Sequence, residues 1–245
     1  YVQIIPSADG IKGRLTEELG GEAESAGNSA GLNIAGAIKG AIAAAGIGAL
    51  IKSTLSEGSA LQQSIGGIET LYKESSDTMI KYANEAYKTA GMSANDYMQT
   101  STSFAAALLK GVGGDTAKAA EAANTAIIDM SDNANKMGSS MDSIQMAYQG
   151  FAKGNYNMLD NLKLGYGGTK TEMERLLSDA QKLTGVKYDM NNLSDVYSAI
   201  HVIQDELGVT GTTAREGATT FEGSMSAMKA AAQNLMGSIA LGEDI

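Results

Sequence analysis

The sequence predicts an all-α protein, a compact multi-helix bundle of short helices, and three observations lead to this fold class. Its 245 residues contain a single proline, Pro6, so the strongest helix breaker is absent after that position. The chain is rich in residues that favour helices, such as alanine, leucine, methionine and glutamate. Only residues 1–5 look β-like. We therefore expect a bundle flanked by an N-terminal Gly/Ala-rich apolar helix and a C-terminal heptad helix that begins a coiled coil.

Charge and composition exclude several classes of function. The chain carries 28 acidic and 18 basic residues, a formal charge of −10, and has no basic run that could follow a phosphate backbone. We therefore expect no specific nucleic acid binding. The absence of cysteine excludes disulfides and thiolate metal sites within this sequence. The sequence reads as a piece of a longer protein.

The N-terminal segment, residues 1–57, contains an apolar stretch at residues 32–51. Ile34, Ile38 and Ile42 lie on one face of a helix there. A second face is a small-residue packing face that lets helix backbones approach closely, made of Gly36, Gly40, Ala44 and Gly48. Lys39 interrupts the apolar run, and the uncharged part spans only roughly 18 Å of a ~30 Å hydrocarbon core. We therefore expect self-association or conditional membrane insertion rather than a permanent transmembrane helix.

The middle of the chain, residues 58–217, is predicted to be the helical bundle domain. Polar breaks containing glycine separate amphipathic segments, and glycine supplies the left-handed geometry that ends helices. Short loops between short helices favour a bundle over a rod. The predicted helices cover residues 60–72, 75–90, 94–110, 115–136, 140–152, 155–163, 170–184, 192–207 and 212–218.

The last segment, residues 218–245, has a different pattern. Its apolar residues alternate in spacing between four and three, as in the a and d positions of a coiled coil. This heptad seam consists of Phe221, Met225, Met228, Ala232, Leu235 and Ile239. It covers less than three heptads, so we interpret it as the start of a coiled coil or rod region.

The stretch LKLGYGGTKTEMERLL at residues 162–177 resembles a phosphate-binding loop but fails its spacing. A P-loop requires four residues between its glycines and then Gly-Lys-Ser/Thr in succession. Here Gly165, Gly167 and Gly168 lie too close together, and Thr169 separates the last glycine from the lysine. Thr169 and Glu172 instead fit a capping box, in which the threonine hydroxyl caps the helix and the glutamate reaches back to the capping residue. We therefore predict a helix connection without a cofactor.

Few residues in the sequence offer catalytic chemistry. The only histidine, His201, flanks the apolar face of helix 192–207, and Asp205 follows one turn later, which predicts a surface His–Asp pair. Residues 132–138 begin like a twelve-residue calcium loop. Counted from Asp132, the twelfth position should be a glutamate that binds the ion with both oxygens, but it is Ser143. We predict no catalytic, cofactor-binding or metal site and no enzymatic activity.

One long segment resembles a known family. SDNANKMGSSMDSIQMAYQGFAKGNYNMLDNLKLGYGGTKTEMERLL, residues 131–177, closely resembles the N-terminal region of tail tape measure proteins from long-tailed phages and prophages of Gram-positive hosts. Residues 1–13, 91–121 and 210–235 look similar to the same family, in the expected order.

This resemblance implies a structural virion protein. It would occupy the lumen of the tail tube, set tail length during assembly in the host cytoplasm, and leave ahead of the DNA at infection. The implied partners are the tail tube protein, tail assembly chaperones, tail tip proteins, further copies of itself as a homo-oligomer, and the host membrane on ejection. The rival interpretation is a secreted helical toxin or effector with a membrane-active helix at residues 32–51. Several hundred residues of heptads after residue 245 would favour a tape measure protein, whereas a catalytic domain would favour an effector.

Overall fold

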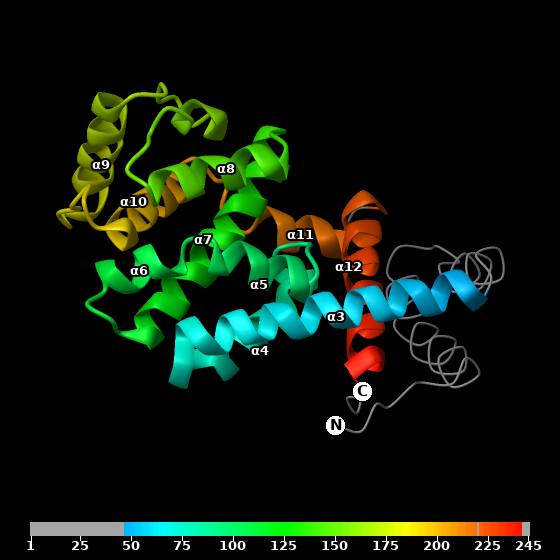
Figure 1. Ribbon diagram of the computed structural model, residues 1–245. Coiled ribbons are helices and arrows are strands. Elements are labelled where there is room, and N and C mark those ends of the chain that lie inside the picture. The colour runs from blue at the N-terminus through cyan, green and yellow to red at the C-terminus, as the bar shows by residue number, and fades with distance from the viewer. Residues whose placement is uncertain (1–46, 220, 242–245) are drawn as a thin grey trace.

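A computed structural model describes residues 47–219 and 221–241, and all regular secondary structure in these ranges is helical (Figure 1). This confirms the all-α, multi-helix fold class. The predicted strand at residues 1–5 lies outside the described residues. In chain order the elements are α3 (Ile47–Tyr72), η1 (Lys73–Ser75), α4 (Ser76–Thr89), α5 (Ala94–Thr102), α6 (Ala105–Gly111), α7 (Thr116–Met137), α8 (Met141–Phe151), η2 (Leu159–Leu162), α9 (Lys170–Thr184), α10 (Leu193–Glu206), α11 (Thr212–Thr219) and α12 (Phe221–Leu241).

Helix α7 is the centre of the bundle, in contact with α4, α5, α6, α8, α10 and α11. Its apolar residues Ile127 and Met130 are fully buried, and its alanines let the neighbouring helices approach closely. Beside it, the ring of Tyr148 lies 4.9 Å from that of Tyr197, which meets Phe104 edge-on at 5.5 Å. Aromatic pairs of this kind add about 0.5–1.5 kcal/mol beyond the apolar area that they bury. The chain from α4 to α11 is therefore folded back on itself around one helix.

Helix α3 begins earlier than the sequence predicts. A helix was expected from residue 60, with a domain boundary between residues 57 and 58, but α3 runs without a break from Ile47 to Tyr72. The boundary expected between residues 217 and 218 likewise falls inside α11. Of the small-residue packing face, Gly48 lies in α3, whereas Gly36, Gly40 and Ala44 lie outside the described residues. Within residues 47–219 and 221–241, no helix combines the length and apolarity needed to cross a membrane.

The heptad positions lie on one helix, α12, which crosses α3 (Figure 1). At the crossing a Cβ atom on Gly237 would come within 2.8 Å of Leu61 Cδ2, and one on Gly58 would overlap the side chain of Ala240. Glycine at both positions thus permits the close approach. Of the seam residues whose side chains are described, Leu235 is buried and Ala232 is half-buried. A coiled coil between chains stays a prediction.

The helix predicted over residues 94–110 is divided into α5 and α6. Three hydroxyl groups at the end of α5 donate to backbone carbonyls: Thr100 to Asp96, Thr102 to Gln99 and Ser103 to Thr100. Such local bonds compete with the helical pattern, and runs of Ser and Thr weaken helices for this reason. The helix predicted over residues 155–163 is only the short 3₁₀ turn η2.

Candidate functional site

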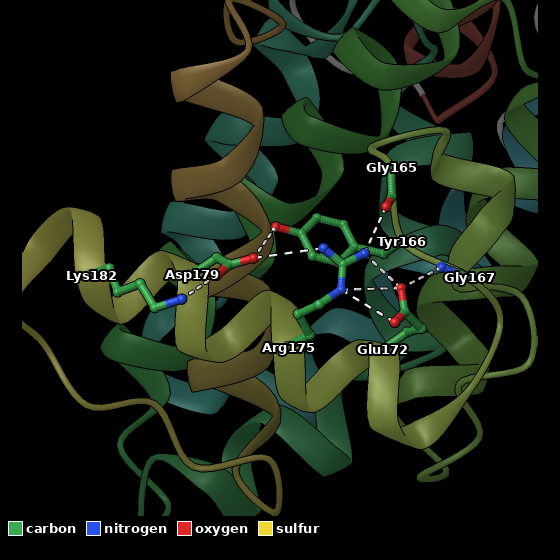
Figure 2. A network of polar contacts seen from close by, with 7 residues as sticks. All are labelled: Gly165, Tyr166, Gly167, Glu172, Arg175, Asp179 and Lys182. Atoms are coloured by element: carbon green, nitrogen blue, oxygen red, sulfur yellow. Dashed lines mark hydrogen bonds and ion pairs between the residues drawn. The ribbon is translucent and has the colours of Figure 1, made fainter.

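The glycine connection, residues 163–169, joins η2 to α9 and is held by the first turns of α9 (Figure 2). Thr169 is the N-terminal capping residue of α9, and its Oγ1 accepts a hydrogen bond from the Glu172 amide at 3.2 Å. The Glu172 carboxylate accepts from the Gly167 amide at 3.0 Å instead of the expected capping-residue amide. The Thr169 amide already donates to the Gly167 carbonyl at 2.9 Å, which explains the difference.

A charged network on α9 closes around this connection. The Arg175 guanidinium donates to the Gly165 carbonyl at 2.7 Å and to Glu172 at 2.6 Å, and it stacks over the Tyr166 ring at 4.2 Å (Figure 2). The Tyr166 hydroxyl donates to Asp179 at 3.1 Å. Burial, followed by this bond to a carboxylate, raises the pKa of Tyr166 to about 12. The loop amide and carbonyl that an outside ligand would need are thus engaged by α9 itself.

We predict that Gly168→Ala destabilises the fold far more than Gly167→Ala. A Cβ atom at Gly168 would overlap the carbonyl oxygen of Asn157, whereas one at Gly167 would meet only Glu172 Cγ at 3.5 Å, an ordinary contact. Overpacking against a fixed backbone atom costs about 1–3 kcal/mol. Chemical denaturation of the two variants measures the difference in unfolding free energy. Equal midpoints for both variants would contradict the close packing of this connection.

A second polar feature runs through the middle of the bundle. We use the name α7 polar stripe for Asp129, Asp132 and Asn133, which lie on one side of α7 and are at most 1% exposed. Each of them bonds a different element. Asp129 bonds α10, Asp132 bonds the start of α11, and the Asn133 amide donates to the Leu162 carbonyl in η2 at 2.9 Å. The stripe therefore joins three elements to the central helix by hydrogen bonds.

The sole histidine is paired with this stripe, and the expected partner was wrong. His201 Nδ1 lies 2.8 and 3.0 Å from the two carboxylate oxygens of Asp129, so its bonded partner is on α7 and not Asp205 on its own helix. The arrangement resembles the His–Asp part of a catalytic triad, in which a carboxylate orients the imidazole. No hydroxyl within residues 47–219 and 221–241 bonds its Nε2 to complete a triad. The pair joins α7 to α10.

The pKa values of Asp129 and His201 are both raised in the folded protein. Burial raises the pKa of Asp129 to about 6, and the bond to His201 opposes part of that shift. The bond to Asp129 raises the pKa of His201, and the nearby carboxylates Asp205 and Asp132 add to this effect. A group whose pKa is raised by folding stabilises the fold below its unfolded pKa, and this contribution is lost as pH rises through its folded pKa.

We therefore predict that the fold loses stability as pH rises from about 4 to about 6, where Asp129 ionises, and loses more above about pH 6.5, the ordinary pKa of a histidine. For Asp129 the contribution is up to about 3 kcal/mol, since each pH unit of pKa difference corresponds to about 1.4 kcal/mol. Folding lowers the pKa of three other carboxyls, Asp115, Glu172 and Asp179. Their contribution to the stability of the fold is lost only as pH falls below their ordinary pKa. Thermal unfolding across this range tests the prediction, with the Asp129→Asn, His201→Gln double variant as control. If the native protein and the double variant show the same pH slope, the pair does not carry the effect.

Asp132 holds the N-terminus of α11. Its carboxylate accepts from the amides of Gly211 and Thr213 at 2.5 and 2.8 Å, and its carbonyl accepts from the Thr212 hydroxyl at 3.3 Å. A carboxylate is favourable at a helix N-terminus because it satisfies free amides and faces the positive end of the helix dipole. In the described ranges, buried side-chain atoms without a hydrogen-bond partner occur next to Asp132, at the start of α11 and on α10: Ser131 Oγ, Asn133 Oδ1, Thr210 Oγ1, Thr213 Oγ1 and Gln204 Oε1.

The structure brings the residues of the glycine connection together, while the small-residue packing face is largely outside the described residues. Sequence reasoning missed the α7 polar stripe. The available signal was the spacing: Asp132 and Asn133 follow Asp129 by three and four residues, which places both beside it on one helix face. Residues 132–137 are helical, so they do not form the calcium-type loop that was considered.

The polar groups of these two features mainly form hydrogen bonds within the chain itself. Among the residues that the structure describes, no three His, Asp or Glu side chains are grouped to hold a metal ion. The glycine connection and the stripe residues Asp132 and Asn133 bond the chain's own backbone, and Asp129 bonds the His201 side chain. Comparisons of the chain with protein-family profiles, with curated proteins and with solved structures find no match.

Proposed function

We propose that this chain is the N-terminal region of a tail tape measure protein, a structural protein of a long-tailed phage or prophage of a Gram-positive host. It would lie in the lumen of the tail tube, set tail length during assembly in the host cytoplasm and be ejected ahead of the DNA. The proposal rests on the resemblance of residues 131–177 to that family.

One observation supports the proposal: the polar residues of this segment hold parts of the fold together. Asp132 bonds the start of α11, Asn133 bonds η2, and Glu172 and Arg175 bond the glycine connection. In a structural protein we expect the polar residues of such a segment to make contacts within the fold. This supports a non-enzymatic role, because the most distinctive sequence of the chain is explained by joints between helices.

The acidic character of the chain fits a protein that shares a conduit with DNA. A formal charge of −10 disfavours binding to a phosphate backbone, so a departing genome would not adhere to it. Under this proposal the partners are the tail tube protein, assembly chaperones, tail tip proteins and other copies of the chain, with the host membrane encountered on ejection. No specific nucleic acid binding and no cofactor are included.

Disruption of the gene in its phage or prophage tests the proposal. Negative-stain electron microscopy of the resulting particles is expected to show missing or misassembled tails, and complementation with the intact gene should restore them. Particles with tails of normal number and length would overturn the proposal. The rival, a secreted effector, predicts normal particles together with loss of a toxic or host-directed activity, so the same mutant distinguishes the two.

A further inference from the structure

Helix α10 is joined to α7 and α8 by polar bonds at three positions along one face. The Tyr197 hydroxyl donates to the Tyr148 carbonyl at 2.9 Å, and the Gln204 side-chain amide donates to the Tyr148 hydroxyl at 3.2 Å. Between them, His201 Nδ1 lies 2.8 Å from a carboxylate oxygen of Asp129. Residues 197, 201 and 204 are four and then three apart, so they share one face of α10. Of these three bonds, only the one between His201 and Asp129 joins two groups that titrate near neutral pH.

In the part of the chain that the structure describes, the charged groups that act most strongly on the His201 imidazole are carboxylates. Asp129 and Asp132 face it from α7, and Asp205 faces it from the next turn of α10. Tyr148 on α8 stays neutral, because burial raises its pKa well above its usual range. Loss of the imidazolium proton therefore leaves the buried carboxylates Asp129 and Asp132 without this cation, and an unpaired buried charge strongly destabilises the contact that contains it.

The other helices packed against α10, which are α6 and α9, supply no buried cation in its place. Their cations are exposed or already paired: Lys110 and Lys170 are exposed, Arg175 bonds Glu172, and Lys182 bonds Asp179. The proton on His201 therefore determines the charge balance where α10 meets α7.

We propose that the bond between His201 and Asp129 is a proton-controlled latch that holds α9 and α10 against α7. The latch is closed while His201 carries its proton, and it opens as pH rises and the proton is lost. Helix α9 packs against α10, and the two lie together at one end of the molecule, so they can separate from α7 as one unit (Figure 1). The latch is independent of the proposed function, and its absence would leave that function unaffected.

Hydrogen exchange of the 245-residue chain, followed by mass spectrometry from about pH 6 to about pH 8, tests the latch. Helices of 15 and 14 residues are marginally stable alone in water, so the amides of α9 and α10 should exchange once the two helices separate from α7. Protection factors, which correct for the intrinsic effect of pH on exchange, are compared with those of α4, which packs against α7 elsewhere. We expect the protection of α10 relative to α4 to fall severalfold across this range. The limit is about tenfold for each pH unit, because opening releases one proton from His201.

Two substitutions that each change one partner should abolish this pH dependence. The side chain in His201→Gln can still donate to Asp129 but carries no charge, and Asp129→Asn keeps the shape of the side chain without its charge. Asp205→Asn is the matched control and should retain the dependence, because Asp205 is exposed and the bond between His201 and Asp129 stays in place. Circular dichroism verifies that each variant is folded.

Three results would overturn the proposal. These are equal loss of protection in α10 and α4 at every pH, a protection of α10 relative to α4 that does not change with pH, and a pH dependence that both His201→Gln and Asp129→Asn retain. The first two come from the native chain alone, so they decide the proposal even if a variant is unfolded.

Discussion

Asp132→Asn is expected to destabilise the fold by about 2–4 kcal/mol, because a buried charged acceptor of two backbone amides is replaced by a group with one fewer acceptor. The side chain is fully buried, so water cannot replace the lost bonds. For a chain of this size the loss corresponds to a decrease in unfolding temperature of about 5–15 °C. Differential scanning calorimetry measures it. The amides of Gly211 and Thr213 should also exchange faster with deuterium.

Asp142→Asn is the matched control for this experiment. Asp142 is an exposed carboxylate in the first turn of α8, so the same chemical change there should cost only a few tenths of a kcal/mol. If both variants unfold at the native temperature, the buried bond to α11 does not stabilise the protein. The two substitutions are isosteric, and the comparison therefore isolates the hydrogen bonds from changes in packing.

Removal of residues 162–185 is expected to abolish the bundle. Met173 and Leu176 are fully buried and Leu177 is 6% exposed, and burial of each such side chain is worth roughly 1.5–3 kcal/mol. Their combined loss equals a large part of the about 5–15 kcal/mol that stabilises a typical domain. We expect an insoluble or molten protein. A triple alanine variant at the exposed positions Lys170, Glu174 and Gln181 should remain folded.

If the proposed function holds, the same deletion discriminates between a compact domain and an extended ruler. A continuous helical rod would shorten by about 36 Å when 24 residues are removed, at about 1.5 Å per residue. Because α9 and α10 cross within a folded unit, contour length there is not converted into span. Electron microscopy should show few or misassembled tails. A normal yield of uniformly shortened tails would contradict the compact arrangement.

The sequence predicted the helices well where local chemistry decides their ends. Residues 170–184 form α9 as predicted, because Thr169 caps its start and Gly185, with a φ of +74°, ends it. The predicted helix ends were wrong where tertiary contacts or competing hydrogen bonds determine them. The hydroxyls of Thr100, Thr102 and Ser103 divide one predicted helix into two, and α3 begins at Ile47, earlier than the predicted start at residue 60.

The burial and the partners of the α7 polar stripe could not be predicted, for a different physical reason. Patterns of amphipathic helices assign polar residues to solvent, but α7 is surrounded by other helices, so its polar side is buried too. Asp129 and Asp132 therefore find partners on α10 and α11, which lie 72 and 79 residues away in the chain. Sequence spacing gives the face of a helix but does not give the element that packs against it. The partner of His201 was mistaken for the same reason.

The crossing of α3 and α12 determines how the fold would respond to tension. Gly58 and Leu61 on the first helix meet Ala240 and Gly237 on the last, so a pull applied at Ile47 and Leu241 is transmitted directly across this contact. Helices α4, α5 and α11 also contact α12, so they carry the part of the load that does not pass through the crossing. Force spectroscopy with handles at these two residues should show first rupture at the crossing. Gly237→Leu, which obstructs the approach of Leu61, should lower the force required.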